Sequence, residues 1–295
     1  MEPIRVLSIV FALFVFTPVP LLSRDAPPVV STDWLERNLE NPALVVLDMR
    51  SAEQYKKGHI PGALHTSLNA WAPGKSGLSL ELPSDEALQT LLGSLGIRSD
   101  SIVVVVHRGD TDFARADATR VAWTCVIAGV KTVSVLDGGH NKWSKENKAV
   151  TNVAAEPRAS VYGGKVDRAT VAFKDYVLRR IGKSVLLDTR APEHYFGADS
   201  KHGHIKSAVS LPTPWAFAEG GVYKDMEELQ RMAAEIIGND KSKEVLVYCG
   251  VGGYASTWWF LLTQVLGYQN VKLYDGSMQE WLQDPGAPLT VHRGD

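Results

Sequence analysis

Cys249 stands in the sequence context that a nucleophilic cysteine needs. It follows an apolar, β-branched run over residues 244–248 and opens a glycine-rich loop, Cys249-Gly-Val-Gly-Gly-Tyr254, with an apolar helical stretch over residues 258–266 close behind. Loop amides and a helix N-terminus aimed at the sulfur both favour an anion there. The pattern therefore predicts a reactive thiolate at the carboxyl end of a strand.

The other cysteine, Cys125, lies in an apolar helical run over residues 121–128. A cysteine in such a run is typically a small buried hydrophobe. The sequence therefore predicts that the two cysteines do not pair and that Cys249 is a free thiol. The cysteine and histidine spacings match no common zinc-ligand pattern, so no metal is expected.

Four sequence blocks occur twice in the chain at nearly the same spacing. Asp48 and Asp188 are 140 positions apart, and Trp143 and Trp281 are 138 apart. A near-constant offset over four blocks indicates an internal duplication. The paired blocks are residues 46–50 and 186–190, 55–63 and 201–208, 102–106 and 245–248, and 129–143 and 267–281.

Short apolar runs alternate with helical patterns in each copy. Residues 102–106 are apolar on both faces, as in a sheet covered on each side, whereas residues 85–95 and 225–237 show i, i+3, i+4 spacing with an acidic first turn. Each copy is predicted to be an α/β domain, a mostly parallel sheet flanked by helices on both faces. The predicted division is a leader over residues 1–25, a first domain over 26–147, a linker over 148–165 and a second domain over 166–295.

In α/β sheets of this kind, ligands bind at the carboxyl ends of the strands. Cys249 follows one such strand, and His107 follows the matching strand of the first copy. Because the first copy has no cysteine at this place, it is predicted to be catalytically silent. An alternative role for His107 and Arg108 is to present positive charge across the domain interface.

The first 25 residues resemble a secretory leader. They carry one early positive charge, then an apolar run over residues 6–16 that only Ser8 interrupts. Such a run is too short to span a bilayer comfortably. We expect a periplasmic or secreted protein without stable membrane contact after cleavage; an uncleaved anchor and a mispredicted start are the alternatives. The net charge of −2 gives no reason to expect a nucleic-acid partner.

Taken in order, the duplicated Asp-x-Arg, Gly-His-Ile and Asp-Gly-x4-Trp segments and the Cys-Gly-x-Gly loop resemble the two-domain rhodanese sulfurtransferases over residues 29–290. The resemblance implies tandem rhodanese-like domains, with an inactive first copy that helps to wall the active site. It also implies that Cys249 is the catalytic residue. The loop residues that it assigns to sulfur and substrate binding are Gly250, Val251, Gly252, Gly253 and Tyr254.

The activity that this resemblance implies is sulfur transfer without a cofactor. The Cys249 thiolate would take a sulfane sulfur from thiosulfate or 3-mercaptopyruvate, carry it as a persulfide and pass it to cyanide or a thiol. The partners are therefore small molecules, and we expect a monomer.

The sequence departs from the family where the sulfur donor would bind. His194 replaces a typical arginine, and residues 66–83 contain no histidine and a single acid, Glu81. Neither the thiosulfate pattern nor the mercaptopyruvate pattern is intact, so the sulfur donor stays open. The altered loop positions, which are basic or hydroxyl-bearing in other members, are Gly250, Val251 and Tyr254.

Several other residues have a structural interpretation because they occur in both copies. Aspartates and arginines of the Asp-x-Arg segments are predicted to fix strand ends, and Arg190 is predicted to face the sulfur donor in addition. The repeated histidines are predicted to make structural hydrogen bonds. Two tryptophans are equally compatible with core and pocket positions. These residues are Asp48, Arg50, Asp188, Arg190, His59, His204, Trp71 and Trp215.

Two other functions also use a reactive cysteine. Phosphatases and arsenate reductases with a Cys-x5-Arg loop need an arginine six positions after the cysteine, and Ala255 stands there. An exported sulfur carrier, redox sensor or partner-binding module could instead use Cys249 without turnover. The second alternative stays open.

Overall fold

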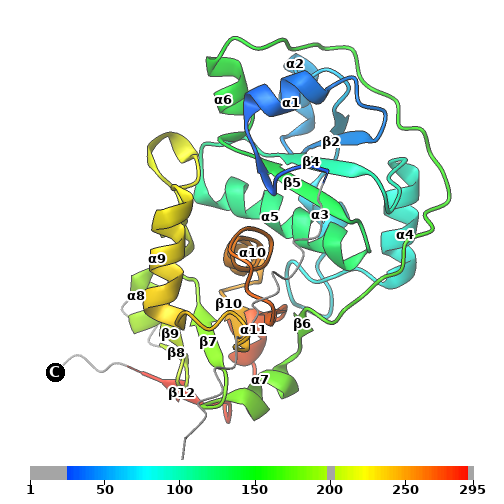
Figure 1. Ribbon diagram of the computed structural model, residues 1–295. Helices are drawn as coiled ribbons and strands as arrows, with labels where there is room; N and C mark the ends of the chain where they lie inside the picture. The colour runs from blue at the N-terminus through cyan, green and yellow to red at the C-terminus, as the bar shows by residue number, and fades with distance from the viewer. Residues whose placement is uncertain (1–24, 198–202, 292–295) are drawn as a thin grey trace, which may run out of the picture.

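The structure is a computed structural model that describes residues 25–197 and 203–291. Two five-stranded sheets have the same strand order, β1-β5-β4-β2-β3 in the first half and β6-β11-β10-β7-β9 in the second (Figure 1). All pairings within these two sheets are parallel. The duplication in the sequence is therefore a duplication of the fold.

The strands of the first sheet are β1 (Val29–Val30), β2 (Leu44–Asp48), β3 (Leu64–His65), β4 (Ile102–Val106) and β5 (Thr132–Leu136). Those of the second are β6 (Val171–Ala172), β7 (Val185–Asp188), β9 (Val209–Ser210), β10 (Val245–Tyr248) and β11 (Val271–Tyr274). A separate antiparallel pair joins β8 (His204–Ile205) and β12 (Leu289–Thr290).

The helices of the first half are α1 (Thr32–Asn38), α2 (Ala52–Lys57), α3 (Leu68–Trp71), α4 (Asp85–Ser94), α5 (Asp112–Ile127) and α6 (Gly139–Lys145). Those of the second half are α7 (Lys174–Arg180), α8 (Pro192–Phe196), α9 (Met226–Ile237), α10 (Gly253–Phe260) and α11 (Ser277–Trp281). Two 3-10 turns (Thr213–Ala216 and Glu219–Gly221) and a π-helical turn after α10 (Leu261–Val265) complete the second half.

Strand β4 is apolar on both faces because helices cover both faces of its sheet. All five of its residues are buried. Val103 and Val105 belong to the hydrophobic cluster that includes α5, whereas Val104 and Val106 pack in the cluster with α1 and α6. Successive side chains of a strand point to opposite faces, so both faces of this sheet need an apolar cover. The predicted α/β fold with flanking helices is confirmed.

Local capping signals set the helix boundaries that the sequence predicted. Ser84 caps α4 by accepting a hydrogen bond from the Ala87 N–H, with two acidic residues in the first turn. Asp225 caps α9 in the same way through the Glu228 N–H. An N-cap acceptor and early negative charge stabilise a helix N-terminus.

The two halves meet where α5 packs against α10 (Figure 1). Thr119 and Ser256 share a hydrogen bond of 2.8 Å between their hydroxyl oxygens, and the Trp123 and Trp259 rings meet edge to face at 6.3 Å. The largest hydrophobic cluster runs through this contact and contains residues of both halves. This shared core holds the first half against the site described below.

The connecting segment over residues 152–168 follows the surface of the first half without helix or strand (Figure 1). Tyr162 donates to the Ala128 carbonyl at 2.8 Å, and the Ser160 N–H donates to the Gly93 carbonyl at 2.9 Å. Residues 1–24 of the expected leader, and residues 201–202 of one repeated block, lie outside the described residues. Within the described part of the chain, no helix is both long and apolar enough to cross a membrane.

Candidate active site

Cys249 lies at the carboxyl end of β10, immediately before the turn into α10. Gly252 adopts a left-handed conformation (φ 83°) at the N-cap of α10, and its N–H donates a hydrogen bond to Cys249 Sγ at 3.1 Å. The side chain is 2% exposed and unpaired. The sulfur therefore sits against a main-chain donor at a helix start, an environment that favours negative charge.

Hydrogen bonds with the first turn of α11 fix the cysteine loop. The Cys249 N–H donates to Ser277 Oγ at 3.2 Å, while the Met278 N–H donates to the Cys249 carbonyl at 3.0 Å and the Gln279 N–H to the Gly250 carbonyl at 2.9 Å. These bonds leave little freedom for the main chain that presents the sulfur.

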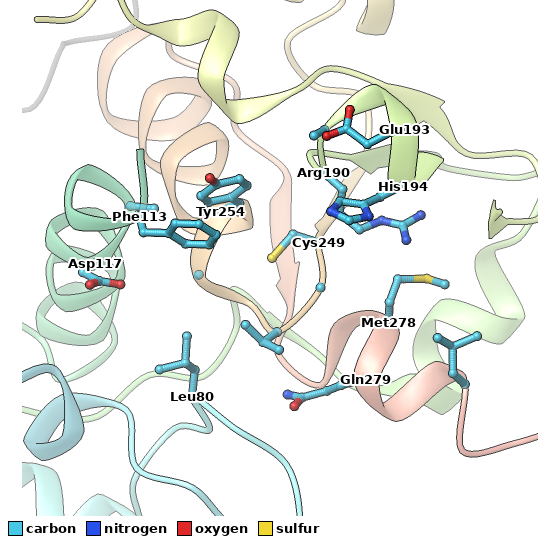
Figure 2. A pocket seen from close by; sticks show the side chains of 16 residues that line it. Leu80, Phe113, Asp117, Arg190, Glu193, His194, Cys249, Tyr254, Met278 and Gln279 are labelled. Atoms are coloured by element: carbon cyan, nitrogen blue, oxygen red, sulfur yellow. The ribbon is translucent and has the colours of Figure 1, made fainter. Parts of the chain in front are cut away.

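A cavity of about 530 Å³ opens over the Cys249 sulfur between the two halves. Figure 2 shows Arg190, His194 and Tyr254 around it from the second half and Phe113 facing them from the first. A concave site of this volume is typical of small-molecule binding. The residues that line it are Leu80, Phe113, Ala116, Asp117, Arg190, Ala191, Glu193, His194, Cys249, Gly250, Val251, Gly253, Tyr254, Met278, Gln279 and Leu282.

Arg190 lines this cavity, and its guanidinium is fixed by Asp188 and by the Gly203 carbonyl. Its Nε and Nη2 atoms donate to both carboxylate oxygens of Asp188, at 2.6 Å for the shortest contact, and Nη2 also donates to the Gly203 carbonyl at 2.7 Å. Burial lowers the pKa of Arg190, but the hydrogen bonds and charge of Asp188 outweigh burial and raise it. The guanidinium is thus a fixed, permanently protonated group whose charge is largely matched by Asp188.

Two further titratable groups of the cavity are shifted by burial. Burial raises the pKa of Asp117 to about 6. It also raises the pKa of Tyr254 to about 12, with a smaller contribution from the Asp112 charge. The Tyr254 phenol is therefore neutral at physiological pH. The Asp117 carboxyl group loses its proton at a pH slightly below the physiological range.

A buried ion pair stands directly behind the cysteine loop. Arg120 on α5 and Asp275 after β11 approach to 2.6 Å, and the Leu82 N–H donates to Asp275 Oδ2 at 2.9 Å. Glu81, the one acid of the 66–83 loop, lies beside this pair and does not line the cavity. Burial, followed by the Asp275 charge, raises the pKa of Glu81 to about 7.

The residues predicted for the site converge on one cavity. Arg190, Gly250, Val251, Gly253 and Tyr254 line it with Cys249, whereas Gly252 contributes its N–H from behind. One detail of the prediction was wrong: α10 begins at Gly253 rather than near residue 258, so Tyr254 lies in the first helical turn and not in the loop.

The resemblance implied that the first half helps to wall the active site, but the sequence did not identify the residues that do so, namely Leu80, Phe113, Ala116 and Asp117. None of these residue types is unusual for a loop or a helix. Phe113, Ala116 and Asp117 reach the cavity because α5 packs against α10, whereas the loop that carries Leu80 is hydrogen-bonded to Gln279 of the second half through Ser79. No signal in the sequence singles them out.

The repeated residues take structural positions in both halves. The Arg50–Asp48 contact measures 2.6 Å, as does the Arg190–Asp188 contact. His59 stacks on Tyr55 with ring centroids 3.7 Å apart, and His204 on Tyr195 at 3.8 Å. Neither histidine lines the cavity. Of the two tryptophans, Trp71 is buried in the core and Trp215 is half exposed, and neither is a wall of the cavity.

His107 occupies the place in the first half that Cys249 occupies in the second. The His140 N–H donates to its carbonyl at 2.8 Å, as the Met278 N–H does to the Cys249 carbonyl. Burial, together with the Arg115 charge, lowers the pKa of His107 to about 3, so this histidine is neutral and does not present positive charge. Arg108 pairs with Asp110 at 2.9 Å.

Cys125 is buried in α5 and unpaired, as the sequence predicted. Burial raises the pKa of its thiol well above the ordinary range, so it stays protonated. Among the described residues, no group of three or more histidine, cysteine, aspartate or glutamate side chains is placed to hold a metal ion.

These features define a two-domain α/β protein with a single cysteine loop at the domain interface. The family model of the rhodanese-like domain matches residues 31–146 and 174–284. The chain belongs to the rhodanese-like family and carries two such domains.

Curated relatives and a solved structure match along most of the chain. It is 32% identical to a protein of Mycolicibacterium smegmatis assigned as a thiosulfate sulfurtransferase, over 89% of this chain and 97% of that protein. It is 33% identical to the sulfur carrier protein TtuD of Thermus thermophilus, over 88% and 95%. The crystal structure of SseA from Escherichia coli, described among the 3-mercaptopyruvate sulfotransferases, superimposes with a TM-score of 0.74 at 26% identity, over 85% and 99%.

Proposed function

We propose that this protein is a sulfurtransferase that moves a sulfur atom from a small donor, thiosulfate or 3-mercaptopyruvate, to cyanide or a thiol through a persulfide on Cys249. Membership in the rhodanese-like family and the names of the relatives support the class of enzyme. The observation that carries the proposal is the Gly252 N–H that donates to Cys249 Sγ at the floor of the cavity.

The covalent steps of the reaction take place on Cys249. The Cys249 thiolate attacks the outer sulfur of thiosulfate, the sulfur–sulfur bond breaks, and sulfite leaves with the bonding pair. Cyanide then attacks the outer persulfide sulfur and leaves as thiocyanate, which returns the thiolate. A main-chain N–H at the sulfur stabilises the anion in both resting and product states.

The first half serves as a wall rather than as a second active site. It has the buried, neutral His107 where the second half has Cys249. Its contribution to the reaction is the face of the cavity that Leu80 and Phe113 form. We therefore keep the division into a silent first domain over residues 26–147 and a catalytic second domain over residues 166–295 as part of the proposal.

A second function, a sulfur carrier without turnover, is favoured by one specific observation. A relative at 33% identity is named a sulfur carrier protein. The same Cys249 persulfide would then be handed to a partner instead of to a small acceptor.

Thiocyanate production under multiple-turnover conditions tests the proposal. With thiosulfate or 3-mercaptopyruvate and excess cyanide, we expect many equivalents of thiocyanate per protein, none with Cys249→Ser and unchanged turnover with Cys125→Ser. A single equivalent of thiocyanate per protein, with no further turnover, would favour the sulfur carrier. Transfer that survives Cys249→Ser would contradict both functions.

The compartment and assembly belong to the same proposal. The apolar run over residues 6–16 supports a leader and a periplasmic or secreted location. We also propose that the protein is a monomer. The mass of the mature N-terminus after expression, with cell fractionation and size-exclusion chromatography, tests these three statements.

A further inference from the structure

A second cavity, of about 560 Å³, lies between the loop after β4, helix α6 and residues 218–222 of the other half. It shares no lining residue with the cavity over Cys249, which measures about 530 Å³. The proposed sulfur transfer uses none of its residues. The charged and amide side chains that line it are Asp110, Arg115, Asn141, Lys142 and Lys145.

The internal duplication relates this second cavity to the active-site cavity. The Asn141 N–H donates to the Arg108 carbonyl at 3.1 Å, and the Gln279 N–H donates to the Gly250 carbonyl at 2.9 Å. Asn141 lines the second cavity, and Gln279 lines the cavity over the cysteine. In both halves, therefore, the loop after the central strand and the helix that is hydrogen-bonded to it form one side of a cavity.

The opposite side of each cavity comes from the other half of the chain, and it is anchored in the same way. The Tyr223 N–H donates to Asp137 Oδ1 at 2.9 Å, which holds residues 218–222 over the first half. The Leu82 N–H donates to Asp275 Oδ2 at 2.9 Å, which holds the Leu80 loop over the second half. The silent half thus has the walls of a ligand site although it has no cysteine.

The charges that line the two cavities differ in sign. The active-site cavity has one arginine, Arg190, and two carboxylates, Asp117 and Glu193. The second cavity has three cations and one carboxylate, Asp110, which is paired with Arg108 at 2.9 Å. Positive charge that lines a cavity attracts an anionic ligand. The three cations are Arg115, Lys142 and Lys145.

The two lysines of α6 are free to meet a ligand. Lys145 is exposed and forms no ion pair with any described residue. Lys142 Nζ lies 3.0 Å from Glu146 Oε1, an i,i+4 pair at the helix surface that contributes little to stability. Arg115 is fixed instead, because its Nη1 donates to the Gly109 carbonyl at 3.0 Å. The cavity therefore combines two adjustable ammonium groups with one fixed guanidinium.

Two glycines of the second half keep this cavity open. Gly221 has a φ of 76°, and a Cβ there would lie 2.5 Å from Arg115 Nη1. Gly220 has a φ of 80°, and a Cβ there would meet no atom within 4 Å. Glycine is favoured at both positions by the left-handed backbone, so the turn presents main chain rather than bulky side chains to the cavity.

We propose that the second cavity binds a phosphorylated small molecule, with the phosphate group beside Lys142 and Lys145 and the organic part against residues 218–222. A phosphate monoester carries about −1.5 to −2 charge near neutral pH and accepts strong hydrogen bonds from lysine and arginine. The cavity volume of about 560 Å³ exceeds what inorganic phosphate fills, which is why an organic part is expected. This site lies outside the sulfur-transfer reaction and does not depend on it.

Isothermal titration of the full chain with four probes tests the proposal: glucose 6-phosphate, glucose 6-sulfate, inorganic phosphate and glucose. We expect one equivalent of glucose 6-phosphate to bind, with an affinity about tenfold higher than that of glucose 6-sulfate or inorganic phosphate, and no binding of glucose. Because the attraction is between charges at a partly open site, the affinity should fall as sodium chloride is raised.

Variants place the ligand in the second cavity. Lys145→Gln removes the unpaired cation, and Ala218→Glu adds negative charge to the opposite wall, so each should weaken binding by about tenfold or more. Lys131→Gln, at an exposed lysine before β5, and Ala218→Gln, of similar size without charge, are the matched controls and should change affinity by less than about threefold. Cys249→Ser should bind as wild type does. The thermal midpoint of each variant without ligand confirms that it is folded.

Each remaining outcome overturns the proposal. Wild type that binds neither glucose 6-phosphate nor inorganic phosphate has no such site. Equal affinity for glucose 6-phosphate and its sulfate, or tighter binding of the sulfate, removes the phosphate assignment. Binding that survives Lys145→Gln and Ala218→Glu, or that Lys131→Gln weakens equally, removes the ligand from this cavity. Binding that is lost in Cys249→Ser places the ligand at the active site instead.

Discussion

Arg120 and Asp275 form an ion pair across the two halves of the protein, with 2.6 Å between Nη1 and Oδ1 and with both side chains buried. Arg120 lies on α5, where its guanidinium also stands over the Trp123 ring at 4.6 Å, and Asp275 follows β11. The pair therefore joins the shared core to the segment between β11 and α11, which lies against Gly252 of the cysteine loop.

Removal of one partner of this pair should be costly. Arg120→Met would leave the Asp275 carboxylate buried without its counter-ion, which typically destabilises a protein by about 3–5 kcal/mol. Chemical denaturation measures the free energy of unfolding. The matched control is Arg98→Met, which breaks an exposed pair with Asp100 and should change stability by no more than about 1 kcal/mol. Equal effects of the two substitutions would contradict the structural role of the pair.

The duplicated Asp-x-Arg segments provide an internal control for the role of Arg190. Arg190→Met and Arg50→Met each break a buried ion pair of 2.6 Å with an aspartate two residues earlier, so we expect similar losses of stability. Only Arg190 lines the cavity, and so only Arg190→Met should also lower kcat/KM of the folded protein, by about tenfold or more, equivalent to ~1.4 kcal/mol. An equal loss of activity in Arg50→Met would show that Arg190 acts through stability alone.

Gly252 occupies a position that only glycine fills without strain. Its φ is 83°, and a Cβ there would lie 2.9 Å from the Asp275 carbonyl oxygen and 3.0 Å from Arg120 Nη1. Gly252→Ala should therefore displace the N–H that contacts the sulfur, destabilise the protein by about 1–3 kcal/mol and slow persulfide formation. Gly250→Ala, where the space is open, should leave stability nearly unchanged. Stopped-flow kinetics of persulfide formation compares the Gly252→Ala and Gly250→Ala variants. Equal rates for the two variants would argue against a role of the Gly252 amide.

Asp117 should give the reaction a characteristic pH dependence. Its pKa is raised to about 6 by burial, so the side chain is neutral below this pH and becomes a negative charge beside the sulfur donor above it. The charge repels an anionic donor, so the kcat/KM ratio of Asp117→Asn to wild type should be near one at low pH and rise several-fold as the pH passes about 6, which corresponds to roughly 1 kcal/mol. Asp100→Asn, on the exposed surface, is the control. If the kcat/KM ratio of Asp117→Asn to wild type stays constant over the same pH range, Asp117 does not act on the sulfur donor.

The helices and strands could be predicted from the sequence because the signals for them are local. The run of Ile102 and four valines predicts a strand covered on both faces, and the acidic starts at Asp85 and Asp225 predict helices that the structure contains at those places. Because the sequence is duplicated, the four paired blocks occur in both halves of the chain. These helix and strand signals depend on only a few neighbouring residues, so they can be recognised without knowledge of the tertiary structure.

The cavity could be predicted from the sequence only in part. Cys249 and Arg190 follow strands that are neighbours in one sheet, so their proximity follows from topology. The apolar side chains from the first half could not be placed in this way. Phe113 reaches the cavity through the packing of α5 on α10, and Leu80 through a loop in which Ser79 is hydrogen-bonded to Gln279. The start of α10 was also misjudged, since Gly253 and Tyr254 are weak helix formers that tertiary packing overrides.

The most direct test of the central claim is the mass of the peptide that contains Cys249 after the protein has been incubated with a sulfur donor under non-reducing conditions. The account predicts that this peptide gains the mass of one sulfur atom, that the peptide with Cys125 does not, and that cyanide removes the added sulfur as thiocyanate at the rate of turnover. A protein that turns over while Cys249 stays unmodified, or that carries the sulfur on another residue, would contradict it.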